Sequence, residues 1–140
     1  MAKLDNGFSL IEIMIAVVIV AILASISYPA YQQYVLRTYR AEAIETLLTI
    51  ANAQEQYFAD HGVYQGDISQ LNGLLNLVTA SSTKSGRYTI NLSLTEMAAG
   101  FSVLATATGS QTADSGCLSF QLNHFGQRNL HNGVAISCWQ

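Results

Sequence analysis

The first quarter of the chain is an apolar stretch, and the remainder alternates between apolar and polar residues as in a soluble protein. Between Phe8 and Leu36 the only charged residue is Glu12. The 21 residues from Phe8 to Tyr28, as a helix rising about 1.5 Å per residue, match a hydrocarbon layer of about 30 Å. The stretch has no polar side, so it predicts a membrane-spanning helix and not a surface amphipathic helix.

A one-sided pattern continues beyond Pro29. No glycine interrupts the chain from Phe8 to Asp60, so we expect one helix about 80 Å long, whose second half packs on a folded head. Pro29 removes a backbone hydrogen bond and is expected to kink the helix, and Gly62 suits the left-handed conformation that ends one. The expected buried side of residues 35–60 is Ile44, Leu47, Leu48, Ala51 and Phe58, opposite Glu42, Glu45, Thr49, Asn52 and Gln56.

The rest of the chain predicts a small antiparallel sheet. Stretches of alternating pattern occupy residues 87–94, 101–107 and 118–122, with a turn at 124–128, a short fourth strand near 135–139, and a helical turn or two in the leucine-rich piece 71–78. Three or four strands do not bury both faces by themselves. The apolar stripe of the long helix is their natural cover, which predicts an α+β fold.

Composition alone leaves a secretory signal peptide open as an alternative, because Ala24 to Ser27 resembles a small-residue cleavage site. Glu12 argues against it. A carboxylate at the centre of a membrane costs about 2.5 kcal/mol or more, and an ordinary signal peptide gains nothing from it. The helical pattern that continues past Pro29 also favours an anchor.

The two cysteines, Cys117 and Cys138, lie near the C-terminal end without a CxxC or Cys/His cluster, which disfavours a zinc site. A disulfide between them closes a loop of about 22 residues and contributes about 3 kcal/mol in the chain-entropy model. It also fixes a terminus that otherwise frays. Two free buried thiols are the alternative. The disulfide implies an oxidising compartment outside the cytoplasm.

Charge and the polar side chains exclude several function classes. The net charge is -3, and the cations beyond the apolar stretch are separated in sequence, so nucleic acid is not an expected partner. Clustering of those cations in the fold would favour DNA binding; they are Arg37, Arg40, Lys84, Arg87 and Arg128. No catalytic arrangement of histidines is arguable from spacing, and no dense carboxylate loop suggests calcium. We therefore expect no enzyme activity, cofactor or metal.

The segment Gly7-Phe8-Ser9-Leu10-Ile11-Glu12 resembles the processing motif of type IV prepilins. The resemblance implies that residues 1–7 are a leader, and that a prepilin peptidase cuts between Gly7 and Phe8 and methylates the new Phe8 amine. It further implies that Glu12 of one subunit pairs with the Phe8 amine of a neighbour during assembly. Each charge is costly alone in a dry environment, so this pairing would set the register of the subunits.

Later parts of the chain resemble the PilE-type minor pilins of type IVa pili, on stretches 28–35, 40–43 and 54–58 and the ending Cys138-Trp139. Pro29 stands where many relatives also carry proline. The resemblance implies a pilin fold with a transmembrane and assembly half at 8–34, a helix half at 35–60 packed on the head, an αβ-loop at 61–86, and a sheet and disulfide region at 87–140.

The function that this resemblance implies is that of a minor pilin supporting pilus assembly. Such a subunit is held in bacterial inner-membrane lipid with its head in the periplasm. It then enters an extracellular filament with other pilin subunits, through the inner-membrane assembly machinery. A major pilin and a type II secretion pseudopilin are the alternatives within the structural class. A pilus subunit that binds DNA or another ligand is the alternative from a different class.

Overall fold

The computed structural model describes residues 7–71, 81–128 and 136–139. The chain divides into two compact units, Met1–Val35, here called the N-terminal unit, and Leu36–Gln140, here called the head. Residues 1–6 of the predicted leader and most of the predicted helical turn at 71–78 lie outside the described residues.

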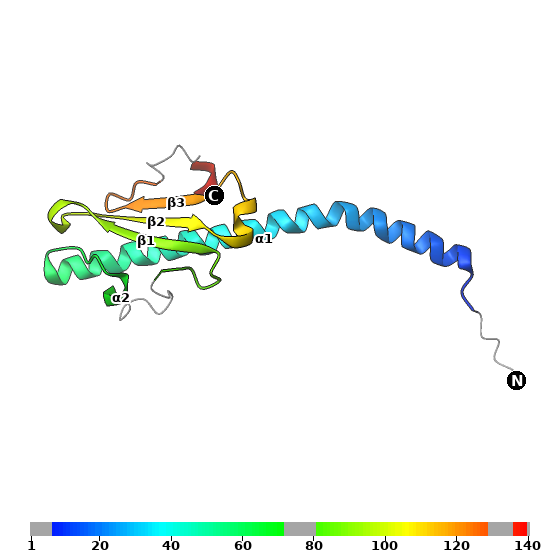
Figure 1. Cartoon of the computed structure of the whole chain (residues 1–140), viewed down its shortest axis with the longest axis horizontal. Helices are drawn as coiled ribbons and strands as arrows, with labels where there is room; N and C mark the ends of the chain where they lie inside the picture. The colour runs from blue at the N-terminus through cyan, green and yellow to red at the C-terminus, as the bar shows by residue number, and fades with distance from the viewer. Residues whose placement is uncertain (1–6, 72–80, 129–135, 140) are drawn as a thin grey trace, which may run out of the picture. The chain divides into compact units, whose positions relative to one another are not determined.

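One helix, α1, occupies Leu10–His61 and contains Pro29. The sequence predicts this helix to within two residues at each end. Beyond His61 the Gly62 amide donates a hydrogen bond of 2.8 Å to the Phe58 carbonyl, and Gly62 has φ +74°, the left-handed conformation expected of a helix end. In the head, α1 lies along the three strands (Figure 1).

The side of α1 that faces the core differs from the prediction by about one residue position. Leu48 and Phe58, expected to be buried, are 40% and 38% exposed. Gln54 is fully buried, although it is polar and was not among the residues expected to be buried. The buried positions of α1 are Leu36, Ala43, Thr46, Leu47, Ile50, Ala53 and Gln54.

A polar residue such as Gln54 can face the core because its amide is fully bonded. Its amide nitrogen donates to the Gln65 carbonyl at 2.5 Å, and its amide oxygen accepts from the Gln65 backbone N–H at 3.0 Å. With both ends of the amide bonded, a fully buried glutamine costs little. It also ties the last turns of α1 to the connector that follows.

The sheet contains three antiparallel strands in the order β1-β2-β3. Their bounds are β1 Tyr88–Leu94, β2 Phe101–Ala107 and β3 Ser119–Asn123, each within one residue of the prediction. Short helices complete the described parts of the head: α2 at Ile68–Leu71, η1 at Glu96–Ala98, η2 at Gly109–Ala113 and η3 at Ile136–Trp139.

The predicted fourth strand is wrong where the structure describes it, because Ile136–Trp139 is the 3-10 helix η3. In this compact turn two adjacent residues, Cys138 and Trp139, make separate contacts. Cys138 forms a disulfide with Cys117, and the Trp139 ring packs edge-on against Phe120 with centroids 5.7 Å apart. An extended strand would send these adjacent side chains to opposite faces.

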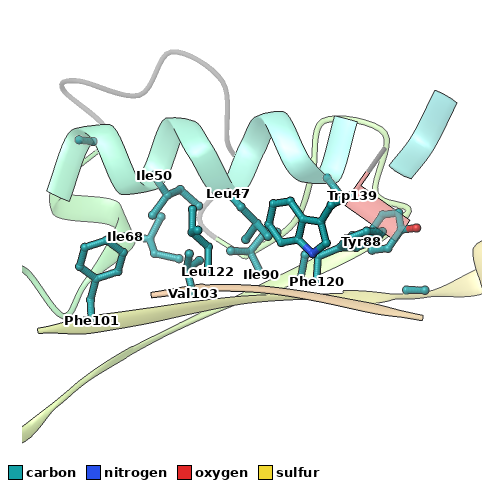
Figure 2. Packing of buried hydrophobic residues seen from close by; sticks show 14 of the residues in the cluster. Leu47, Ile50, Ile68, Tyr88, Ile90, Phe101, Val103, Phe120, Leu122 and Trp139 are labelled. Carbon is teal, nitrogen blue, oxygen red and sulfur yellow. The ribbon is translucent and has the colours of Figure 1, made fainter. Parts of the chain in front are cut away.

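The core of the head lies between α1 and one face of the sheet (Figure 2). Alternate residues of each strand point into it, as the alternating pattern predicts: Tyr88 and Ile90 from β1, Phe101, Val103 and Ala105 from β2, and Phe120 and Leu122 from β3. The head thus confirms the predicted α+β fold, in which a long helix covers a three-stranded antiparallel sheet.

Candidate functional site

The N-terminal unit begins with an accessible stretch of chain just before α1. Gly7 and Phe8 lie outside the helix, and the Phe8 side chain is 78% exposed. The Ser9 carbonyl accepts hydrogen bonds from the amides of Glu12 and Ile13 at 3.1 and 3.3 Å, so Ser9 starts the helix. A peptide bond between Gly7 and Phe8 in such a non-helical stretch is open to a protease.

Glu12 lies in the first turn of α1. A carboxylate there is favoured by the partial positive charge of the free helix amides. Glu12 is exposed, as are all residues of the unit from Gly7 to Tyr34. Its predicted pairing with a neighbour's Phe8 amine, and the predicted kink at Pro29, stay predictions.

From Ile13 to Ala24 the surface of α1 is apolar on every side. An 18-residue window reaches a mean hydropathy of 2.7 with none of it buried, which by length and composition is enough to cross a membrane. Leu10, Ile11 and Val20 are 81%, 60% and 65% exposed. An apolar surface of this extent marks a region for contact with lipid or protein.

At the start of the head, a part-buried polar cluster links α1 to the segment after β2. The Arg40 guanidinium pairs with both carboxylate oxygens of Asp114. The Gln111 amide nitrogen lies 3.3 Å from Asp114, 2.9 Å from the Tyr88 hydroxyl and 3.2 Å from the Leu36 carbonyl. We call these five residues the polar clamp.

Two members of the polar clamp have a raised pKa. The hydrogen bond to Asp114 raises the pKa of Arg40 above its ordinary value, against the opposing effect of burial. Burial raises the pKa of Tyr88 to about 12. Both groups therefore keep their neutral-pH protonation states, and the clamp holds a fixed pattern of donors and acceptors. Sequence reasoning missed it, because Arg40 and Asp114 are 74 positions apart.

The predicted disulfide is present between Cys117 and Cys138, whose Cα atoms are 5.7 Å apart. It adjoins the polar clamp, since the Cys117 amide donates to the Asp114 carbonyl at 2.9 Å. The C-terminal turn is therefore attached covalently next to the contact between Asp114 and α1.

The cations of the head do not all lie beside the same face of α1. Arg40 belongs to the polar clamp, Arg87 lies over the Tyr39 ring at 4.7 Å, and Arg128 lies over the Trp139 ring at 5.1 Å. Lys84 lines a pocket with Glu42, Glu45, Thr46 and Thr49, whereas Arg128 lines another with Leu48, Ala51, Asn52 and Glu55. These two sets of helix positions lie on different faces of α1.

Among the residues of the three strands, those on the outward face of the sheet carry no charge. They are Thr89, Asn91 and Ser93 from β1, Ser102, Leu104 and Thr106 from β2, and Ser119, Gln121 and Asn123 from β3. Cross-strand bonds join some of them, such as Gln121 to the Ser102 hydroxyl at 2.8 Å. A surface of this kind offers hydrogen bonds but no attraction for phosphates.

The remaining candidates for chemistry have structural partners. His61 stacks on Tyr57 with ring centroids 4.0 Å apart, His124 lies beside Phe125, and Asp67 accepts two hydrogen bonds from Ser69. His131 lies outside the described residues. Within the described ranges, no group of three or more His, Cys, Asp or Glu side chains is placed to hold a metal ion.

Comparison with protein families gives two matches that together cover most of the chain. Residues 29–121 match the family described as "Type IV minor pilin ComP, DNA uptake sequence receptor". Residues 3–28 match the "Prokaryotic N-terminal methylation motif".

Curated relatives and a solved structure agree with these matches. The chain is similar to fimbrial protein EcpC of Eikenella corrodens, with 36% identity over 79% of this chain and 66% of the relative. It is 38% identical to type IV major pilin protein PilE of Neisseria gonorrhoeae over 63% of this chain and 50% of the relative. The chain thus spans between half and two thirds of the length of these relatives.

A solved type IV pilin from Shewanella oneidensis has the same fold, with a TM-score of 0.51 and 23% identity over 71% of this chain and 97% of that chain.

Proposed function

Because the chain belongs to the type IV pilin family, we propose that it is a minor subunit of a type IV pilus, processed between Gly7 and Phe8 and methylated on the Phe8 amine. Pilins are structural subunits that assemble with one another into filaments. The observation that carries the proposal is an apolar helix, exposed over its whole length in the N-terminal unit, that starts directly after an accessible Gly7–Phe8 bond.

Each part of the chain has a task in this proposal. Residues 1–7 are the leader, and 8–34 are the membrane anchor and the assembly segment. Residues 35–60 attach this segment to the head, 61–86 form the αβ-loop, and 87–140 form the sheet and disulfide region. Glu12 pairs with the Phe8 amine of a neighbouring subunit, which compensates two charges that are each costly in a dry environment.

Before assembly the anchor is held in the inner membrane with the head in the periplasm. The Cys117–Cys138 disulfide supports that location, because disulfides persist in oxidising compartments. It also disfavours a type II secretion pseudopilin. The partners are the prepilin peptidase, the inner-membrane assembly machinery and other pilin subunits.

Deletion of the gene tests the minor role against that of a major pilin. A minor subunit that supports assembly predicts few or no surface pili at an unchanged level of the major pilin, with pili restored when retraction is also blocked. A chain that makes up most of the protein mass in purified filaments would instead be a major pilin.

A DNA receptor is the second candidate, favoured by the description of the family that matches residues 29–121. The outward strand residues of the head are uncharged, which argues against the sheet face as a DNA-binding surface. Gel-shift titration of the full chain in detergent tests this. Tight binding whose affinity falls about linearly with salt on a log–log scale would establish the receptor role, and no shift at micromolar protein and low salt would exclude it.

A further inference from the structure

Three tyrosines project from α1 where its apolar stretch ends. Tyr28, Tyr31 and Tyr34 are 66%, 66% and 70% exposed. Spaced three residues apart, they share one side of the helix and extend about 9 Å along its axis. The Gln32 amide donates to the Tyr28 hydroxyl at 2.9 Å, so polar groups are already gathered at this level of the helix.

We propose that Tyr28, Tyr31 and Tyr34 form a tyrosine girdle that sits in the lipid headgroup layer on the head side of the membrane and fixes the depth of the anchor. The proposal rests on the proposed function, in which the chain is held in a bilayer before assembly. Tyrosine favours this layer because its ring is apolar and its hydroxyl remains hydrated.

The composition around the girdle fits a membrane boundary. On the N-terminal side, the stretch from Ile13 to Ala24 contains no polar side chain. On the C-terminal side, Gln32 and Gln33 follow, and then Arg37. The three tyrosine side chains carry no charge, so a neutral phospholipid surface suffices to hold the girdle.

The spacing along the helix links the girdle to the processing site. Phe8 lies twenty positions before Tyr28, which for an upright helix is about 30 Å, the thickness of the hydrocarbon core. With Tyr28 at one boundary of that core, Phe8 reaches the other boundary, where its new amine stays hydrated. Glu12 then lies about 6 Å inside the same boundary, close enough for its carboxylate to reach the headgroups.

Replacing the tyrosine girdle should let the anchor change its depth in the bilayer. Leucine at all three positions would extend the apolar run to position 31, just before Gln32, and make it about 36 Å long, longer than the hydrocarbon core. A helix with such a mismatch shifts or tilts until its apolar length is accommodated. Either response moves residues near Tyr28 deeper into the bilayer.

Depth measurements on the full chain test the girdle. A spin label on Ala24→Cys is placed one helical turn inside Tyr28, and the two native cysteines are already paired. Its depth in neutral phosphatidylcholine–phosphatidylethanolamine vesicles is obtained from collision with oxygen against a polar nickel complex. The variants compared are Tyr28→Leu/Tyr31→Leu/Tyr34→Leu and, as the matched control that retains an aromatic girdle, the triple Tyr→Trp variant.

The girdle predicts that the label lies deeper in the triple Leu variant, by about 3 Å if the longer apolar run recentres, and at unchanged depth in the triple Trp variant. Equal depth in all three chains would overturn it. If the triple Leu variant keeps its depth but fails to enter filaments, the tyrosines contact neighbouring subunits and not lipid. Because the vesicles contain neither peptidase nor filament, this result is separate from the tests of the proposed function.

Discussion

Replacing Arg40 by Met is the sharpest test of how the head is fixed to α1. The Asp114 side chain is 5% exposed and the Arg40 side chain 19%. Met keeps much of the volume of the arginine stem but removes the guanidinium. The carboxylate is then left with the weaker contact to the Gln111 amide at 3.3 Å.

Breaking a buried ion pair by removing one partner costs about 3–5 kcal/mol. Because Arg40 is partly exposed and water can enter its place, we expect Arg40→Met to lower the free energy of unfolding by about 2–4 kcal/mol. The double variant Arg40→Met/Asp114→Leu removes both charges. Its free energy of unfolding should fall by less than that of the single variant, since no uncompensated charge remains buried.

Urea unfolding of the full chain in detergent, followed by fluorescence, measures these differences. Trp139 is the only tryptophan and is 8% exposed in the core, so its emission reports unfolding of the head. A loss below about 1 kcal/mol for Arg40→Met, or a double variant less stable than the single one, would refute the reasoning.

Four further outcomes are expected. Stability of the head should fall as pH rises from about 10 to about 12, because burial raises the pKa of Tyr88 to about 12, and Tyr88→Phe should flatten that part of a pH–unfolding curve. Cys138→Ser should cost about 3 kcal/mol in urea unfolding. Gln54→Leu should cost about 1–3 kcal/mol by the same assay, because two backbone groups of Gln65 lose their partners. Glu12→Ala should leave cleavage intact on immunoblots but abolish incorporation into filaments.

The long helix and the strands could be predicted from the sequence, because each of their patterns has one dominant cause. The run after Phe8 lacks both glycine and charge apart from Glu12, and the strands alternate because one face packs on α1. The motif before α1 and the pair Cys117–Cys138 were likewise visible as local features.

Features that depend on contacts between distant segments could not be predicted. The buried side of α1 includes Gln54, whose amide bonds to Gln65, and sequence alone does not reveal that these hydrogen bonds form. The pairing of Arg40 with Asp114 joins α1 to the segment after β2. The C-terminal turn, expected as a strand, takes its form from Cys138 and its disulfide.

The central claim is that the chain is cut after Gly7 and works as a pilus subunit from Phe8 onward. Intact-mass and fragment analysis of the chain recovered from purified filaments tests it most directly. The account predicts a mature chain that begins with N-methylated Phe8 and contains one disulfide. A chain that still begins at Met1, or one cut near Ser27 as by a signal peptidase, would contradict it.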